Sequence, residues 1–185
     1  MKKILVAMAL SLSLVALCAG CLHKGWNPSA PEPQKSQNHG EAAEAIASFR
    51  THDPGMKTFF ERAYGYAVFP TVGKGGMGVG GAYGKGEVYE RGVRIGTSSL
   101  TQLTIGWQLG GQAYSEIIFF KNRKALSDFK KGNFELGAQA SAVAVTAGAS
   151  ADASFDKGVA VFTLAKGGLM YEASIGGQKF SFDPK

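Results

Sequence analysis

Apolar residues between positions 42 and 64 recur with the period of a helix. The spacing i, i+3, i+4, i+7 occurs twice, with a break at Asp53 and Pro54, and this predicts two consecutive helices. The Asp53 side chain can accept a free amide hydrogen and Pro54 suits a first helical turn, so the second helix is expected to begin there. The two apolar sets are Ala42, Ala45, Ile46 and Phe49, then Met56, Phe59, Phe60, Ala63 and Tyr64.

The apolar faces of these two helices are expected to cover a sheet. The alternative is an amphipathic pair that dips into lipid, but a helix of that kind normally has a basic polar face. Here the polar positions carry both signs of charge, which favours packing on the sheet: Glu41, Glu44, Arg50, Lys57, Glu61 and Arg62.

From Tyr66 onward the pattern changes to a period of two, which predicts strands with one covered face. Residues 116–120 and 159–164 are apolar on both sides and are expected to be central strands. Residues 122–131 interrupt the strands and predict one short helix capped by Asn122, with Leu126 and Phe129 facing inward. The alternating runs are Leu103, Ile105, Trp107 and Leu109; Phe134, Leu136, Ala138, Ala140 and Ala142; and Leu169, Tyr171, Ala173 and Ile175.

Glycine-containing turn signals separate these runs at hairpin spacing rather than at the spacing of helical crossovers. The expected fold is therefore α+β. It consists of a strongly curved antiparallel sheet or a partly closed β-barrel, with two N-terminal helices and one inserted short helix.

The first 20 residues have the order of a secretory signal. Lys2 and Lys3 precede an apolar run from residue 4 to residue 17, and small residues follow. The run is shorter than the roughly 20 residues that span a bilayer, so a retained transmembrane helix is the weaker alternative. We expect a lipoprotein signal peptide at 1–20, a flexible proline-rich tether at 21–40, and one domain at 41–185.

The end of this signal, LCAGC, resembles the lipobox of bacterial lipoproteins. The resemblance implies cleavage before Cys21, attachment of diacylglyceryl and palmitate chains to that cysteine, and loss of Cys18. Leu22 is not the aspartate that signals inner-membrane retention in lipoproteins. The implied location is thus the outer membrane of a bacterial envelope, with the domain facing the periplasm. A redox or metal-binding Cys-x-x-Cys is the alternative reading of the two cysteines.

Composition and residue patterns argue against two classes of function, nucleic-acid binding and catalysis. Of 20 basic residues, two lie in the signal, which leaves 18 against 14 acidic residues. This excess is small and scattered, so a nucleic-acid partner is not expected. No histidine, serine or carboxylate pattern singles out a catalytic pair, and His23 and His39 lie in the tether. The sequence therefore predicts a protein that is not an enzyme and needs no cofactor or metal.

The glycine-rich stretch GKGGMGVGGAYGKGEV at 73–88 contains the G-x-G-x-x-G spacing of a dinucleotide loop. Such a loop must open a helix and be followed by a ribose-binding acid about 20 residues later. Neither condition is met, so a strand with one bare face is the better interpretation. Lys74 and Lys85 would then lie about 36 Å apart if the strand is fully extended, too far to share one phosphate unless the strand bends sharply.

The segments YAVFPTVGKGGMGVGGAYGKGEVY, IGWQLGGQAYSEIIFF, GAQASAVAV and KGGLMYEASIGGQKF together resemble the SYLF domain family in its bacterial secreted form, over residues 41–182. Gly176 replaces a glutamate that is usual in the family. The resemblance implies a lipid-binding module. Its eukaryotic relatives are associated with phosphoinositides and some with actin, which a periplasmic protein does not meet.

The function expected from this resemblance is binding of anionic, phosphoinositide-like lipid head groups by a non-catalytic, lipid-anchored envelope protein. Candidate contacts are Lys57, Arg62, Lys74 and Lys85, and Cys21 is the lipid-attachment residue. The alternative is a structural outer-membrane lipoprotein that binds another envelope protein and has no specific lipid affinity.

Overall fold

A six-stranded sheet in the order β4-β5-β3-β1-β2-β6 forms the centre of the computed structural model, which describes residues 33–106, 111–132, 134, 136, 142–166 and 175–185. Residues 32–185 make up one unit with its own core. Its strands are β1 (Gly65–Glu90), β2 (Val93–Gly106), β3 (Gln112–Phe120), β4 (Val143–Ala144), β5 (Val159–Ala165) and β6 (Gln178–Pro184). Its helices are α1 (Pro33–His52), η1 (Pro54–Met56), α2 (Lys57–Arg62), α3 (Arg123–Lys130) and η2 (Ala149–Ala151).

The α+β class with two N-terminal helices and one inserted helix is confirmed. All strand pairs are antiparallel except β4 with β5, which is parallel, so the sheet is mixed. Among the described residues no pairing joins β4 to β6, and the sheet is open rather than closed into a barrel.

The long strand β1 folds back on itself. Its first arm, 65–74, pairs with β3, and its second arm, 78–90, pairs with β2. The two arms lie against each other: the rings of Tyr66 and Tyr89 stack at 4.8 Å, and a Cβ built on Gly86 would lie 2.4 Å from the Val68 carbonyl oxygen. Gly76, with φ +152°, lies between the arms. The expectation of a strand is therefore correct, but the expected extended separation of Lys74 and Lys85 is wrong.

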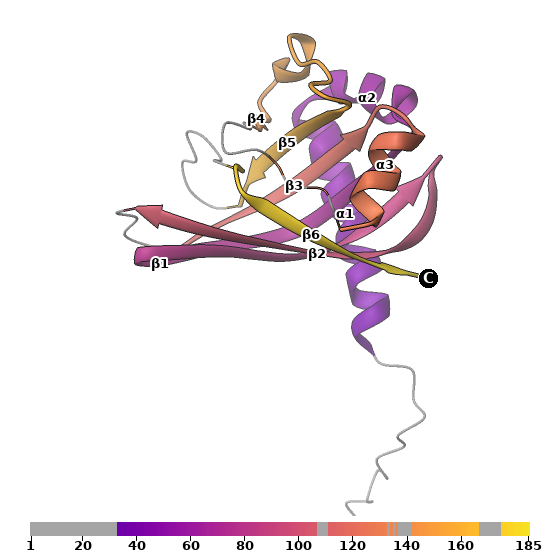
Figure 1. The fold of residues 1–185 in the computed structure, drawn as a ribbon. Coiled ribbons are helices and arrows are strands. Elements are labelled where there is room, and N and C mark those ends of the chain that lie inside the picture. Colours follow the sequence, from indigo (N-terminus) through magenta and orange to yellow (C-terminus); the bar gives the residue numbers. More distant parts are fainter. Residues whose placement is uncertain (1–32, 107–110, 133, 135, 137–141, 167–174) are drawn as a thin grey trace, which may run out of the picture. The chain divides into compact units, whose positions relative to one another are not determined.

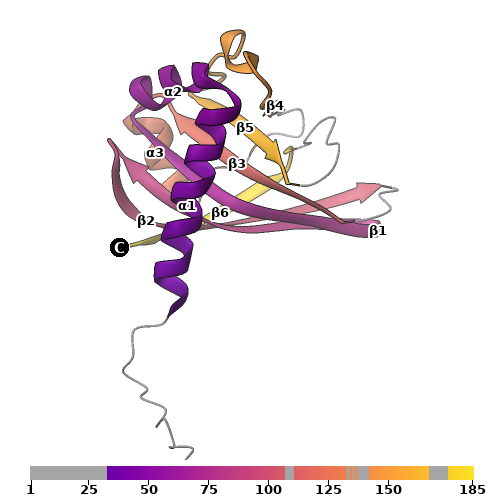
Figure 2. The ribbon, with the colours of Figure 1, turned by 180° about the vertical axis from the view of Figure 1, so that it is seen from behind.

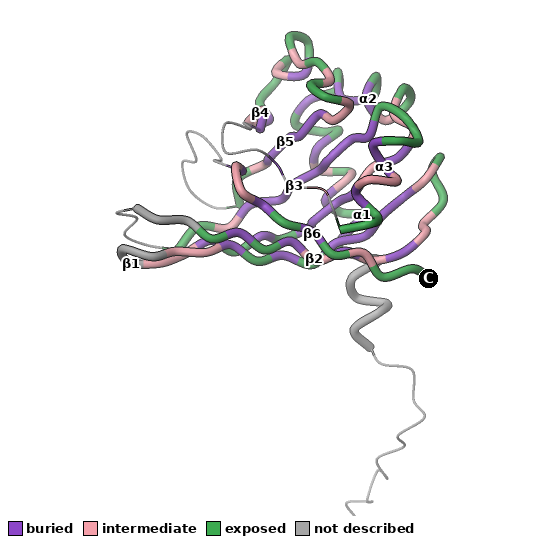
Figure 3. The backbone as a smooth tube through the Cα atoms, in the orientation of Figure 1, coloured by how far each residue is buried: buried purple, intermediate pink, exposed green. Residues whose placement is uncertain are grey.

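Helices cover both faces of the sheet, with α1 over one face and α3 over the other (Figures 1 and 2). Alternate residues of each strand fall into two buried clusters, as the period of two requires (Figure 3). We call the face under α1 and α2 the outer face; it buries Val68, Ile117, Phe119 and Phe162. The face under α3 is the inner face, and it buries Phe69, Leu100, Ile118, Phe120 and Phe180.

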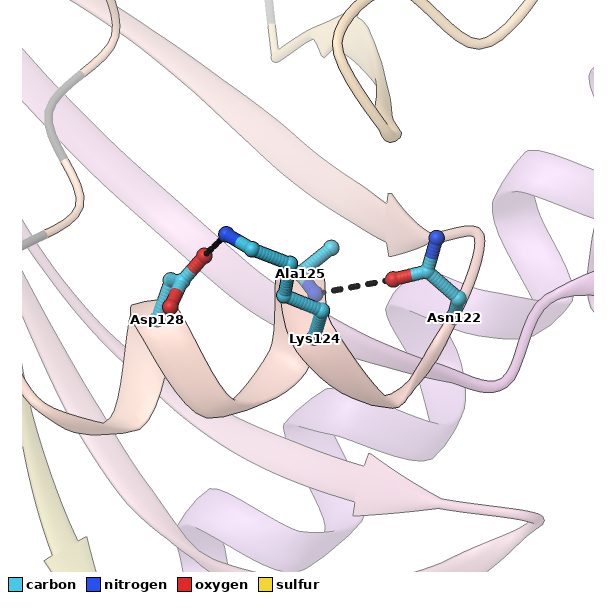
Figure 4. A network of polar contacts seen from close by, with 4 residues as sticks. All are labelled: Asn122, Lys124, Ala125 and Asp128. Carbon is cyan, nitrogen blue, oxygen red and sulfur yellow. Dashed lines mark hydrogen bonds and ion pairs between the residues drawn. The ribbon is translucent and has the colours of Figure 1, made fainter.

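The predicted helix faces and caps are present. Ala42, Ala45 and Phe49 are buried under α1, and Met56 and Phe59 continue the same cluster. At α3 the Asn122 side chain accepts the amide hydrogen of Ala125 at 3.0 Å, and Lys124 pairs with Asp128 one turn on (Figure 4). The helix α1 begins at Pro33, so residues 33–40 of the expected tether are helical.

Two of the strands predicted from the sequence differ from what the structure shows. Leu103 was expected on a covered face, but its side chain is 84% exposed, whereas its neighbour Gln102 is buried. The helices cover the outer face around Val68 and Phe162, and Leu103 lies on that face beyond them. Phe134 and Leu136 are not in a strand. Residues 107–110, 137–141 and 167–174, where other alternating positions were predicted, lie outside the described residues.

Candidate functional site: a cationic cleft beside α2

The four lysine and arginine residues predicted to contact lipid fall in three different environments. Lys57 and Arg62 are exposed on the short helix α2, where Lys57 pairs with Glu61 at 3.6 Å. Lys85 is exposed on the second arm of β1 and belongs to the outer face. Lys74 lies on the first arm and shares the inner face with Val72, two residues before it. Lys57 and Arg62 thus share one short helix, but Arg62 and not Lys57 lines the cleft described below.

Lys74 does not present its ammonium group at the surface. Its side chain is 9% exposed, and burial lowers the pKa of this lysine below its ordinary value. A buried lysine is poorly placed to contact a bilayer surface. Because Lys74 and Lys85 point to opposite faces of the sheet, they cannot share one phosphate, although the reason is their orientation and not the length of an extended strand.

Arg62 lines a cleft of about 710 Å³ between α2 and the segment 150–155. The cleft is formed by residues from three distant parts of the chain: Thr58, Phe59 and Arg62 from α2, Lys121 after β3, and residues around η2. The other lining residues are Gly55, Ser150, Ala151, Ala153, Ser154 and Phe155.

Asp53 fixes one side of this cleft. Its carboxylate is buried and accepts the amide hydrogens of Gly55 at 2.9 Å and of Ser150 at 2.6 Å. Burial alone would raise the pKa of Asp53, but these hydrogen bonds outweigh burial and hold the pKa below its ordinary value. The same carboxylate thus starts η1 and ties η2 to it. A Cβ at position 55 would lie 2.5 Å from the Ser150 hydroxyl oxygen, so a larger residue there would have to displace the Ser150 side chain.

Two cations line the cleft without a partner. Among the described residues, neither the Arg62 guanidinium nor the Lys121 ammonium makes a side-chain hydrogen bond or an ion pair. Thr58, Ser150 and Ser154 line the same space. On the apolar side, the rings of Phe59 and Phe155 lie 5.5 Å apart. This combination suits an amphiphile with an anionic head, because guanidinium and ammonium groups bind phosphate and the aromatic rings accept apolar carbon.

The residues that line the cleft include no histidine, cysteine or carboxylate, and the buried Asp53 beside it is already held by two backbone amides. The exposed Asp152 lies in the sequence between two of the lining residues, Ala151 and Ala153. Within the part of the chain that the structure describes, no three metal-binding side chains gather. The sequence identified Arg62 but missed Lys121 and Ser150, because only the tertiary fold brings them beside α2.

A second group of polar side chains is buried inside the inner face. Glu116 on β3 is fully buried and accepts a hydrogen bond from the Gln178 amide nitrogen at 3.0 Å, and the same nitrogen lies 3.3 Å from the Tyr114 hydroxyl. Burial raises the pKa of Glu116 to about 8, and the Gln178 amide offsets this only in part. At neutral pH the Glu116 carboxyl group is therefore mostly protonated, because burial away from water disfavours its charged form.

These features define a class of protein: an α+β domain with helices on both faces of one curved sheet and a cationic surface cleft. Residues 101–185 match the family model described as "Ysc84: Las17-binding protein actin regulator". The chain is also 24% identical over 165 residues to beta cell expansion factor A of Aeromonas veronii; the alignment covers 88% of this chain and 62% of that protein. Residues 101–185 of the chain thus belong to the SYLF domain family.

The family model begins within β2 and runs through β6, so it includes Lys121 and Ser150 but not Arg62. The expected family membership is thus confirmed. Since the chain spans 62% of the length of the curated relative, the activity of that whole protein is not transferred to this one.

Proposed function

We propose that this protein is a non-catalytic, lipid-anchored envelope protein whose SYLF domain binds the head groups of anionic phospholipids in the cleft beside α2. The observation that carries the proposal is the pair of unpartnered cations, Arg62 and Lys121, on one cleft that also has an aromatic side. A phosphate diester between them would form charge-assisted hydrogen bonds with both groups. Phe59 and Phe155 would contact the glycerol and the first acyl carbons.

The proposal extends to the anchor. Acyl chains on Cys21 would attach the protein permanently to a membrane, because each buried methylene contributes about 0.8 kcal/mol. Cys21 lies outside the described residues, and the lipobox sequence supports this part. Of the helices that the structure describes, none has the length and apolarity needed to cross a bilayer. An anchored domain would meet head groups at high local concentration, so weak affinity would suffice.

Vesicle sedimentation with residues 32–185 tests head-group binding without the anchor. This unit contains both hydrophobic clusters, so it is expected to fold by itself. We expect sedimentation with phosphatidylcholine vesicles that contain phosphatidylglycerol or a phosphoinositide, and much less with phosphatidylcholine alone. High salt should weaken the binding, because the attraction is electrostatic.

The double substitution R62A/K121A should weaken binding to anionic vesicles about tenfold or more, since it removes two hydrogen bonds to a charged group. The matched control is K124A/K131A, which removes the same charge from exposed lysines at α3 on the inner-face side. Equal loss of vesicle binding in both double variants would show that only net charge matters. It would contradict binding of the head group in the cleft. Equal binding of the wild-type unit to neutral and anionic vesicles would contradict the proposed function.

A further inference from the structure

Part of the outer face has none of the described helices over it. Figure 2 shows α1 crossing the sheet and leaving the strands uncovered toward the end where β1 is labelled. Two large apolar side chains are exposed there: Leu103 is 84% exposed and Tyr83 is 52% exposed. We call this region the open face and define it by Tyr83, Lys85, Thr101, Leu103, Lys166 and Lys179.

The strand register places these residues on one side of the sheet. Tyr83 pairs with Thr101, and Thr101 pairs with Lys179, so the three side chains stand in one row across β1, β2 and β6. Leu103 is two residues beyond Thr101 on the same strand and therefore shares its face. Lys85 is related to Tyr83 in the same way.

Lys166 extends the row on the opposite edge. Its backbone amide donates to the Ala113 carbonyl, and its ammonium donates to the Thr71 hydroxyl at 2.8 Å. Ala113 pairs with Gly73 on the first arm of β1 and belongs to the outer face. The row thus runs from Lys166 to Lys179, and its middle positions are small or apolar.

Glycine keeps the middle of the open face bare. The residue opposite Leu103 is Gly81, which has no side chain to cover the leucine. A Cβ built on Gly73 would meet no atom within 4 Å, so the space above that position is empty. The glycines that resemble a phosphate loop in the sequence therefore flatten one end of the outer face.

The charges around the apolar centre indicate what covers it. Lys85, Lys166 and Lys179 are exposed, and the acidic residue that borders them is Glu41 of α1, beside Lys85. A second copy of the chain in a symmetric dimer would bring like-charged lysines together, because a two-fold interface joins a surface to itself. An anionic bilayer complements the lysines and can accept the two apolar side chains without a matching shape.

We propose that the open face docks on an anionic bilayer, with Leu103 and Tyr83 inserted below the phosphates and with Lys85, Lys166 and Lys179 beside them. This inference rests on the proposed function and adds a docking surface to the head-group cleft. The cleft and the open face both belong to the outer side of the sheet, at opposite ends, since Phe59 packs near the far ends of β3 and β5.

The test measures partitioning of residues 32–185 onto vesicles of phosphatidylcholine with phosphatidylglycerol. Leu103→Ser should weaken partitioning about tenfold, because it removes the apolar side chain that enters the bilayer without changing charge. The control is Val93→Ser. Val93 is 66% exposed at the start of β2, at the other end of the β1–β2 pair, so its replacement should leave partitioning unchanged.

A gain-of-function variant makes the test independent of damage to the fold. Gly73→Leu places an apolar side chain in the empty space of the open face, and we expect partitioning to rise severalfold. Unchanged partitioning of both Leu103→Ser and Gly73→Leu, while the wild type still binds anionic vesicles, would overturn the open face and leave the proposed function standing. A wild-type unit that dimerises through Leu103 would also overturn it. Failure of the wild type to bind at all would contradict the proposed function itself.

Discussion

The carboxyl group of Glu116 lies where an ionised group is unfavourable. It is fully buried on the inner face, directly opposite Phe69 on one neighbouring strand and Thr163 on the other. One carboxyl oxygen accepts from Gln178, and the other oxygen has no hydrogen-bond partner among the residues that the structure describes. Protonation removes the charge from this buried carboxyl group. Burial therefore favours the protonated form and raises the pKa of Glu116.

Glu116 should therefore make the stability depend on pH. Its pKa is raised from an ordinary value of 4.5 to about 8, so the folded protein binds more protons than the unfolded chain between these values. The contribution of Glu116 to the free energy of unfolding should fall as pH rises through this window. In Glu116→Gln the melting temperature, followed by circular dichroism, should lose this fall with pH. Glu44→Gln, at an exposed position, should keep the wild-type dependence. Parallel pH profiles of wild type and Glu116→Gln would contradict the argument.

Among the elements, the fold-back of β1 depends on two close approaches of backbone. Gly84 and Gly86 of the second arm lie against the first arm, and a Cβ on either would come within 3.0 Å of its neighbours. These glycines let the arms approach, whereas Gly73 faces open space. The glycine content of this strand thus has two separate physical causes.

Substitution with alanine should separate these causes. Gly86→Ala places a Cβ 2.4 Å from the Val68 carbonyl oxygen and should lower the free energy of unfolding by about 2 kcal/mol, as overpacking does. Gly73→Ala should be neutral or stabilise by about 0.5 kcal/mol, because it restricts only the unfolded chain. Urea denaturation measures both values. A loss at position 73 as large as that at position 86 would show that the difference in packing is irrelevant.

At the scale of the whole molecule, the two proposals combine two kinds of membrane contact: acyl chains on Cys21 and binding through the surfaces of the domain. Cys21→Ala should move most of the protein from the membrane to the soluble fraction of cells, because the hold of the acyl chains is lost. The domain surfaces should leave a smaller fraction attached, and a high-salt wash should remove it. Membrane association that survives both the substitution and the wash would contradict the lipobox interpretation. Fractionation and immunoblotting give the measurement.

The pattern of apolar residues predicted the helices better than it predicted the fold-back of β1 or which strand positions are exposed. The helices were predictable because the period around Ala42, Phe49 and Phe59 is set by the element itself. The fold-back of β1 was not, since a run of glycines around Gly76 contains no specific turn doublet such as Asn-Gly. The covered face of β2 was also missed, because the alternation that includes Leu103 shows which side is apolar but not where the helices end.

The cleft residues, like the exposed strand positions, could not be selected from the local sequence. Arg62 carries no signal that distinguishes it from other exposed arginines, and Lys121 follows an ordinary strand. Their significance comes from the packing of η2 against η1 through Asp53, a contact between residues 97 positions apart. Sequence reasoning could nominate cations from the helix, but only the tertiary structure selects those that share a space.

The pairing of β6 with β2 has a consequence for how the chain reaches its native state. β6 is the last of the described strands in chain order, and it lies beside β2, which begins at Val93 (Figure 1). Until β6 has docked, the outer hydrogen-bonding groups of β2 have no partner among the described strands. During folding β2 is therefore an open edge prone to pairing with other chains.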